Sequence, residues 1–157
     1  MHLSYRLAAP LLFVLGLAAC QAPASDFTDR DASAVRAPID TYVSAALAAD
    51  WDTWGNTLSS DVIFFPPNQA PLVGHDAVMA WVREFPTMTS FTTAPDEVWG
   101  TGDLAYAQGT YSYTATLPDG SAITEQGTYV NIFRLQPDGS WRYTHNIWHS
   151  NLPAPAP

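Results

Sequence analysis

The chain has 157 residues and a formal net charge of −9 at pH 7, with fifteen acidic residues against six arginines and no lysine. Such an acidic surface repels phosphate backbones, so we expect no nucleic-acid partner. The length suits one domain with one core, and an aromatic content of 13% is enough for a packed interior or an aromatic-lined cavity.

The first 19 residues have the pattern of an export signal. Arg6 precedes an apolar run from Leu7 to Leu17, which is shorter than the roughly 20 residues that a permanent membrane span needs. The run ends in Leu17-Ala-Ala-Cys20, which resembles the bacterial lipobox. We therefore predict a signal peptide over residues 1–19, lipid on Cys20, and a membrane-bound tether over residues 20–27. The alternative is an ordinary export signal followed by an incidental cysteine.

Lipidation would also fix the location of the protein. Cys20 is the only cysteine, so its acylation would leave no thiol for a disulfide or for catalysis. Gln21 and Ala22 follow it with no aspartate, which favours the outer membrane in a Gram-negative host. We expect a lipid-anchored protein of the cell envelope whose domain faces the periplasm.

The next part of the chain, up to Pro86, is predicted to be mainly helical. Residues 28–49 carry an apolar stripe with helical spacing, and Thr28 with Asp31 forms an acidic variant of the capping box. Pro38 lies inside this segment and should kink the helix or make it begin late.

A second, shorter helix is predicted from Asp50 through Leu58, followed by a short strand over residues 62–65 that Pro66 stops. A third helix should begin at Gly74-His75-Asp76 and end at Pro86. Its inward face is expected to hold Val78, Trp81, Val82 and Phe85.

From Met88 onward the sequence is typical of strands. Breaks at residues 100–103, 117–120 and 136–139 separate segments rich in Tyr, Thr, Val, Ile and Trp, and the last two breaks contain Pro-Asp-Gly turns. The prediction is an α+β domain over residues 28–152, in which four long antiparallel strands form a strongly curved sheet around three N-terminal helices. The tail at 153–157 consists of Pro and Ala and should be disordered.

This order of elements, together with several local motifs, resembles the SnoaL-like and nuclear-transport-factor-2-like superfamily. The motifs are Ile39-Asp-Thr-Tyr42, Asp50-Trp-Asp52, residues 61–67, residues 74–78, Gly102-Asp-Leu-Ala-Tyr106 and Trp141-Arg-Tyr-Thr-His-Asn-Ile-Trp148. The resemblance implies a cone-shaped α+β barrel with a deep apolar pocket, and often a homodimer through the outer face of the sheet. It implies no particular reaction, because this fold serves enzymes and non-enzymes alike.

The catalytic patterns of this superfamily are incomplete in the sequence. Ketosteroid isomerases of this fold use a carboxylate base on the first strand, and that position falls on Pro66, which has no exchangeable proton. Tyr42, Tyr111 or Tyr129 could donate to an oxyanion, but each is also a good core residue. We therefore favour a domain without catalysis, with an isomerase, cyclase or lyase that uses a non-standard site as the alternative.

No metal or other cofactor is expected. His145 and His149 have a spacing that binds metal on a helix, but on a strand four residues span roughly 13 Å, so one ion cannot reach both imidazoles. His75 beside Asp76 is better explained as a helix start.

The remaining candidate site is the pocket. Strand alternation groups Asn146 with Trp148, and Tyr143 with His145 and Ile147, but it leaves open which group faces inward, and one bulge would exchange them. We favour Asn131, Asn146 and Trp148 inward, where the two asparagines replace acidic residues of related sequences. The predicted pocket residues are Tyr42, Trp54, Phe64, Trp81, Tyr111, Tyr129, Asn131, Asn146 and Trp148. The expected function is binding of a small apolar ligand or of a partner protein, and an interaction module that uses the outer sheet face is a further alternative.

Overall fold

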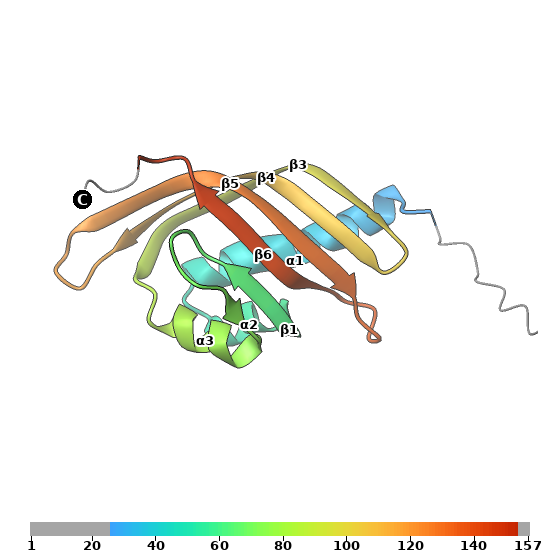
Figure 1. Cartoon of the computed structure of the whole chain (residues 1–157), viewed down its shortest axis with the longest axis horizontal. Coiled ribbons are helices and arrows are strands. Elements are labelled where there is room, and N and C mark those ends of the chain that lie inside the picture. The colour runs from blue at the N-terminus through green and yellow to red at the C-terminus, as the bar shows by residue number, and fades with distance from the viewer. Residues whose placement is uncertain (1–25, 154–157) are drawn as a thin grey trace, which may run out of the picture.

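The computed structural model describes residues 26–153 (Figure 1). The predicted signal peptide, Cys20, most of the tether and the last four residues of the tail lie outside the described residues. Within residues 26–153, no helix combines the length and the apolar character that crossing a membrane requires.

The described chain begins with helices and ends with strands. In order, the elements are α1 (Asp29–Leu47), α2 (Trp51–Gly55), β1 (Leu58–Phe65), β2 (Leu72–Val73), α3 (His75–Arg83), β3 (Thr87–Thr101), β4 (Leu104–Thr116), β5 (Ala122–Leu135) and β6 (Trp141–Ser150).

All strands belong to one curved, unclosed sheet with the order β2-β1-β6-β5-β4-β3. The four long strands β3 to β6 form the predicted antiparallel meander, and β1 joins it in parallel beside β6. The helices lie on one side of the sheet (Figure 1): α1 packs against β3 and β6, and α3 packs against β1. The predicted α+β class and its helix-lined curved sheet are confirmed.

Helix α1 begins where the sequence predicts. The Thr28 hydroxyl accepts from the Asp31 backbone N–H, and the Asp31 carboxylate accepts from the Thr28 backbone N–H at 2.9 Å, which completes the capping box. The helix passes through Pro38, so the predicted late start is wrong. Proline removes the hydrogen bond to the carbonyl four residues earlier, at Ala34, and this residue is exposed, so water can satisfy its carbonyl.

The boundary between α2 and β1 differs from the prediction. The helix ends at Gly55, and Leu58 already belongs to β1, where it is paired with Tyr143 of β6. The backbone N–H of Tyr143 donates to the carbonyl of Thr57 at 2.9 Å. Pairing with a strand more than eighty residues later in the chain therefore overrides the local helical pattern.

The two Pro-Asp-Gly turns form nearly identical hairpin tips between β4 and β5 and between β5 and β6. In each turn the glycine has positive φ, 84° at Gly120 and 82° at Gly139. In each turn the aspartate, Asp119 or Asp138, accepts from the backbone N–H two residues later at 2.9 Å. These turns fix the register of three long strands, and hence the positions of the residues on the inner face of the sheet.

Candidate functional site

A cavity of about 700 Å³ lies between the inner face of the sheet and the helices. Every helix and all four long strands contribute to its wall. The main side chains are Tyr42, Trp51, Trp54, Trp81, Phe85, Phe91, Tyr111, Tyr113, Glu125, Tyr129, Asn131, Tyr143, Asn146 and Trp148. Volumes of this size hold drug-sized ligands.

The walls are formed by aromatic rings in mutual contact. Tyr42 on α1 lies 4.8 Å from Trp54 and 5.1 Å from Tyr143, measured between ring centroids. On the other side, the rings of Trp81 on α3 and Trp148 on β6 are 6.3 Å apart. Such contacts fix the orientation of each ring, so the pocket is shaped before any ligand enters.

Eight of the nine predicted pocket residues line this cavity, and Phe64 is the exception. Phe64 on β1 is fully buried behind the wall, with its ring 5.8 Å from those of Trp54 and Trp148. It therefore positions two wall residues instead of facing the cavity.

A β-bulge at Thr144 brings Tyr143 into the pocket. Ile132 pairs with His145, but Phe133 pairs with Tyr143, so Thr144 is the extra residue on β6. Tyr143 therefore shares the inner face with Asn146 and is only 1% exposed. Grouping Tyr143 with His145 on the outer face was wrong, because strict alternation does not hold across a bulge.

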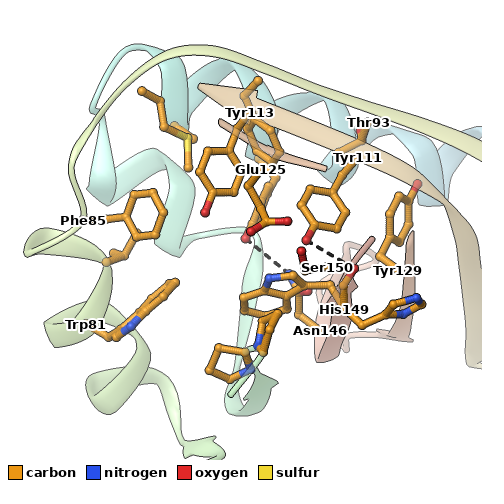
Figure 2. A pocket seen from close by; sticks show the side chains of 18 of the residues that line it. Trp81, Phe85, Thr93, Tyr111, Tyr113, Glu125, Tyr129, Asn146, His149 and Ser150 are labelled. Atoms are coloured by element: carbon orange, nitrogen blue, oxygen red, sulfur yellow. Dashed lines mark hydrogen bonds between the residues drawn. The ribbon is translucent and has the colours of Figure 1, made fainter. Parts of the chain in front are cut away.

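The floor of the pocket is polar and uncharged. Asn131 and Asn146 are directly paired across β5 and β6, and both side chains are buried. Asn146 Nδ2 donates to the Tyr42 hydroxyl at 3.3 Å (Figure 2). Three buried side-chain atoms have no hydrogen-bond partner within residues 26–153: Asn131 Oδ1, the Tyr129 hydroxyl oxygen and, away from the cavity, Ser59 Oγ. Buried polar atoms are almost always paired in proteins, so these three are exceptions, and none of them is exposed to the cavity.

The tyrosines around the cavity are held in the neutral form. Burial raises the pKa of Tyr129 to about 12. It also raises the pKa values of Tyr42, Tyr111 and Tyr143 well above the ordinary range. These hydroxyls can donate or accept a hydrogen bond at neutral pH, but none of them can act as an anionic base there.

The pocket also contains a carboxylate that was not among the predicted pocket residues. Glu125 on β5 is half-buried and points toward the cavity beside Tyr111 and Tyr113 (Figure 2). Its position could have been found from alternation, because 125, 129 and 131 lie on the same face of an unbroken strand. Ser150 also lines the cavity, and the Tyr111 hydroxyl donates to the backbone carbonyl of His149 at 3.4 Å, while the His149 side chain lies beside Thr128 on the outer face.

The other chemical candidates lie elsewhere or lack the needed groups. Pro66 is buried in the pocket wall, where the resemblance to isomerases implies a base. His145 stacks on Phe65, and His75 approaches the carbonyl of Gly55 at 3.1 Å. Across residues 26–153 there is no group of three or more His, Cys, Asp or Glu side chains that could hold a metal ion.

The SnoaL-like domain family matches residues 39–144, most of the chain, and the protein belongs to this family. Among solved structures, a ketosteroid isomerase-like protein from Erwinia carotovora atroseptica has a TM-score of 0.72 at 18% identity, over 80% of this chain and 100% of that one. No curated protein matches the sequence.

Two further solved structures share the fold at 18% identity. A nuclear-transport-factor-2-like protein with a cystatin-like fold from Novosphingobium aromaticivorans has a TM-score of 0.67, over 78% of this chain and 82% of that one. A nuclear-transport-factor-2-like superfamily protein from Salmonella enterica has a TM-score of 0.65, over 79% of this chain and 93% of that one. At this identity the likeness establishes the fold alone, so function must be argued from the pocket.

Proposed function

We propose that this domain binds a small, largely apolar molecule in the aromatic pocket and holds it without chemical turnover. The observation that carries the proposal is a preformed cavity of about 700 Å³ with aromatic walls and uncharged amides at its floor. Pockets of this size and composition bind small, largely apolar molecules, and a few polar groups fix the orientation of the ligand.

The composition of the pocket supports binding over catalysis. The floor carries the amides of Asn131 and Asn146, which neither take up nor release protons at neutral pH. The buried tyrosines are neutral. Each 100 Å² of apolar ligand surface removed from water would contribute about 2.5 kcal/mol, so the aromatic walls can supply most of the affinity.

Native mass spectrometry of the domain from Ser25 onward tests the proposal. We expect a bound molecule of a few hundred daltons that remains with the folded protein and is lost on denaturation. Trp148→Ala should retain less of it, while Ile147→Ala, on the opposite face of the same strand, should retain as much as wild type. Retention unaffected by Trp148→Ala would contradict binding in this pocket.

We further propose that a lipid on Cys20 holds the domain at the periplasmic side of the outer membrane. The support is the lipobox-like Leu17-Ala-Ala-Cys20 after a short apolar run. Cys20→Ser should remain as precursor or leave the membrane fraction, and it should not incorporate radioactive palmitate. Equal labelling of wild type and Cys20→Ser would contradict the anchor.

The outer face of the sheet supports a homodimer. Apolar or aromatic side chains lie in register on five of the six strands, at Val73, Ile63, Ile132, Tyr106 and Trp99, and His145 occupies the same row on β6. Val73 is 67% exposed and Trp99 is 54% exposed. We propose that a second copy covers this row, because exposed apolar bands of this kind mark interfaces.

Sedimentation tests the dimer. Wild type should sediment as a dimer at tens of micromolar, and Ile132→Glu should sediment as a monomer. Thr110→Glu, a polar position on the outer face, is the matched control and should remain dimeric. A wild-type monomer with this row uncovered would instead favour docking to another protein.

Glu125 keeps one catalytic alternative open. A half-buried carboxylate directly across from Tyr113 could accept a proton while a tyrosine hydroxyl stabilises the developing oxyanion, as in an isomerase or lyase. Product detection with the molecule that co-purifies decides between the two readings. Turnover by wild type that Glu125→Gln abolishes would replace the binding proposal.

A further inference from the structure

The pocket has a strong bias in charge. Glu125 is its only acidic residue, the chain contains no lysine, and none of the arginines lines the cavity. Within residues 26–153, Glu125 forms no ion pair with Arg or His, and its carboxylate accepts only from the backbone N–H of Gln126, at 3.0 Å. The half-buried carboxylate therefore faces the cavity without a positive partner.

Aromatic rings surround this carboxylate. Tyr113 lies directly across from Glu125 on β4, and the rings of Tyr111 and Tyr113 are stacked with centroids 6.3 Å apart. The ring of Phe85 is 5.6 Å from that of Tyr113 (Figure 2). The faces of aromatic rings carry negative electrostatic potential and attract cations. A carboxylate among such rings favours a positive group and disfavours an anion.

We propose that the ligand is an organic cation: a protonated amine on an aromatic or aliphatic body, with its ammonium group at Glu125 and its body against the wall formed by Trp81 and Trp148. This inference rests on the proposed ligand-binding function and names the chemical class of the ligand. The formal charge of −9 on the chain acts in the same direction, because it raises the local concentration of cations and lowers that of anions.

Three probes with one body test the charge preference: 4-phenylbutylamine, 4-phenylbutanol and 4-phenylbutanoate, which are cationic, neutral and anionic at pH 7. Calorimetric titration at 0.15 M salt should give an order of affinity of amine, then alcohol, then carboxylate. We expect the amine to bind about tenfold more tightly than the alcohol, as suits a partly exposed ion pair supported by cation–π contact.

Two variants distinguish the effect of the Glu125 carboxylate from the effect of the overall negative charge of the protein. Glu125→Gln should lower the affinity for the amine about tenfold and change that for the alcohol less than twofold. Glu97→Gln removes the same charge from the outer face, where Glu97 accepts from Tyr106, and it should change neither affinity more than twofold. A separate variant, Tyr113→Leu, keeps an apolar side chain but removes the ring. It should lower the affinity for the amine more than the affinity for the alcohol.

The outcomes distinguish this inference from the function on which it rests. Selective loss of amine affinity in Glu125→Gln supports the inference. Equal affinities for amine and alcohol, or equal losses in Glu125→Gln and Glu97→Gln, overturn the inference and leave ligand binding in place. If none of the three probes binds at millimolar concentration and native mass spectrometry shows no retained molecule, both proposals are overturned.

Discussion

The two faces of β5 differ in how their polar groups are satisfied. On the outer face, polar side chains find neighbours on adjacent strands, as Thr124 does with Thr114 at 3.4 Å and Thr128 does with His149 at 3.2 Å. On the inner face, Tyr129 and Asn131 are buried and keep unpaired atoms. A face built only for stability would carry apolar residues at such positions. The difference fits the proposed ligand on the inner face and the proposed second copy on the outer face.

The alternation of faces on β6 offers the most disruptive test. Deleting Ile147 would make Asn146 and Trp148 adjacent, so one of these two side chains would have to turn to the outer face. We expect loss of the cooperative unfolding transition in circular dichroism melts, because buried contacts in the pocket wall would be lost at once. Deleting Thr144 is the control, because it removes only the extra residue of the bulge: Tyr143 and Asn146 would then be two positions apart and both would stay on the inner face, so the melt should remain cooperative. A cooperative melt of the Ile147 deletion near the wild-type midpoint would contradict this assignment of faces.

The next largest effect concerns burial on neighbouring positions of β5. Phe133 is 0% exposed on the inner face, whereas Ile132 is half-buried on the outer face. Phe133→Ala should lower the free energy of unfolding by about 3–5 kcal/mol. Ile132→Ala should lower it by about 1 kcal/mol in the monomer. Urea unfolding measures both values, and similar losses would mean that the two faces are equally buried.

Substitutions on the two faces of β6 should likewise differ in their effect on ligand affinity. Trp148→Ala removes part of the aromatic wall and should weaken binding of the co-purified molecule by about 2–3 kcal/mol. Ile147→Ala, one residue away and on the outer face, should leave the affinity within about twofold of wild type. Calorimetric titration with that molecule decides, and equal weakening by both substitutions would place the ligand outside the pocket.

The smallest expected effect is a dependence on alkaline pH that comes from the inner face. The folded-state pKa of Tyr129 is about 12, above the unfolded value of about 10, so the folded protein keeps this proton longer. The resulting stabilisation is present below pH 10 and is lost as the pH rises toward 12. Tyr129→Phe should therefore lose about 1 kcal/mol less stability than wild type between pH 8 and pH 11.

The measurement is urea unfolding at the two pH values. At pH 8, Tyr129→Phe should be as stable as wild type or slightly more stable, because it removes an unpaired buried hydroxyl. An identical pH dependence in the two proteins would show that Tyr129 ionises as freely in the folded state as in the unfolded chain.

Local signals in the sequence predicted the elements and most of the site. Thr28 with Asp31 marked the start of α1, and the turns at Asp119 and Asp138 marked two hairpins. The sequence did not predict that Glu125 lines the pocket. A glutamate on a strand is usually solvated, and only the curvature of the sheet together with the helices decides that position 125 lies at the mouth of a cavity.

The sequence by itself determined the class of the fold, because capping residues, turn residues and hydrophobic periodicity act over a few neighbouring positions. It also determined the excess of negative charge. Only the tertiary structure decided the parallel pairing of β1 with β6, the bulge at Thr144 and the inward position of Tyr143. These features depend on contacts between segments far apart in the chain, and their free energies are not encoded in any single stretch of residues.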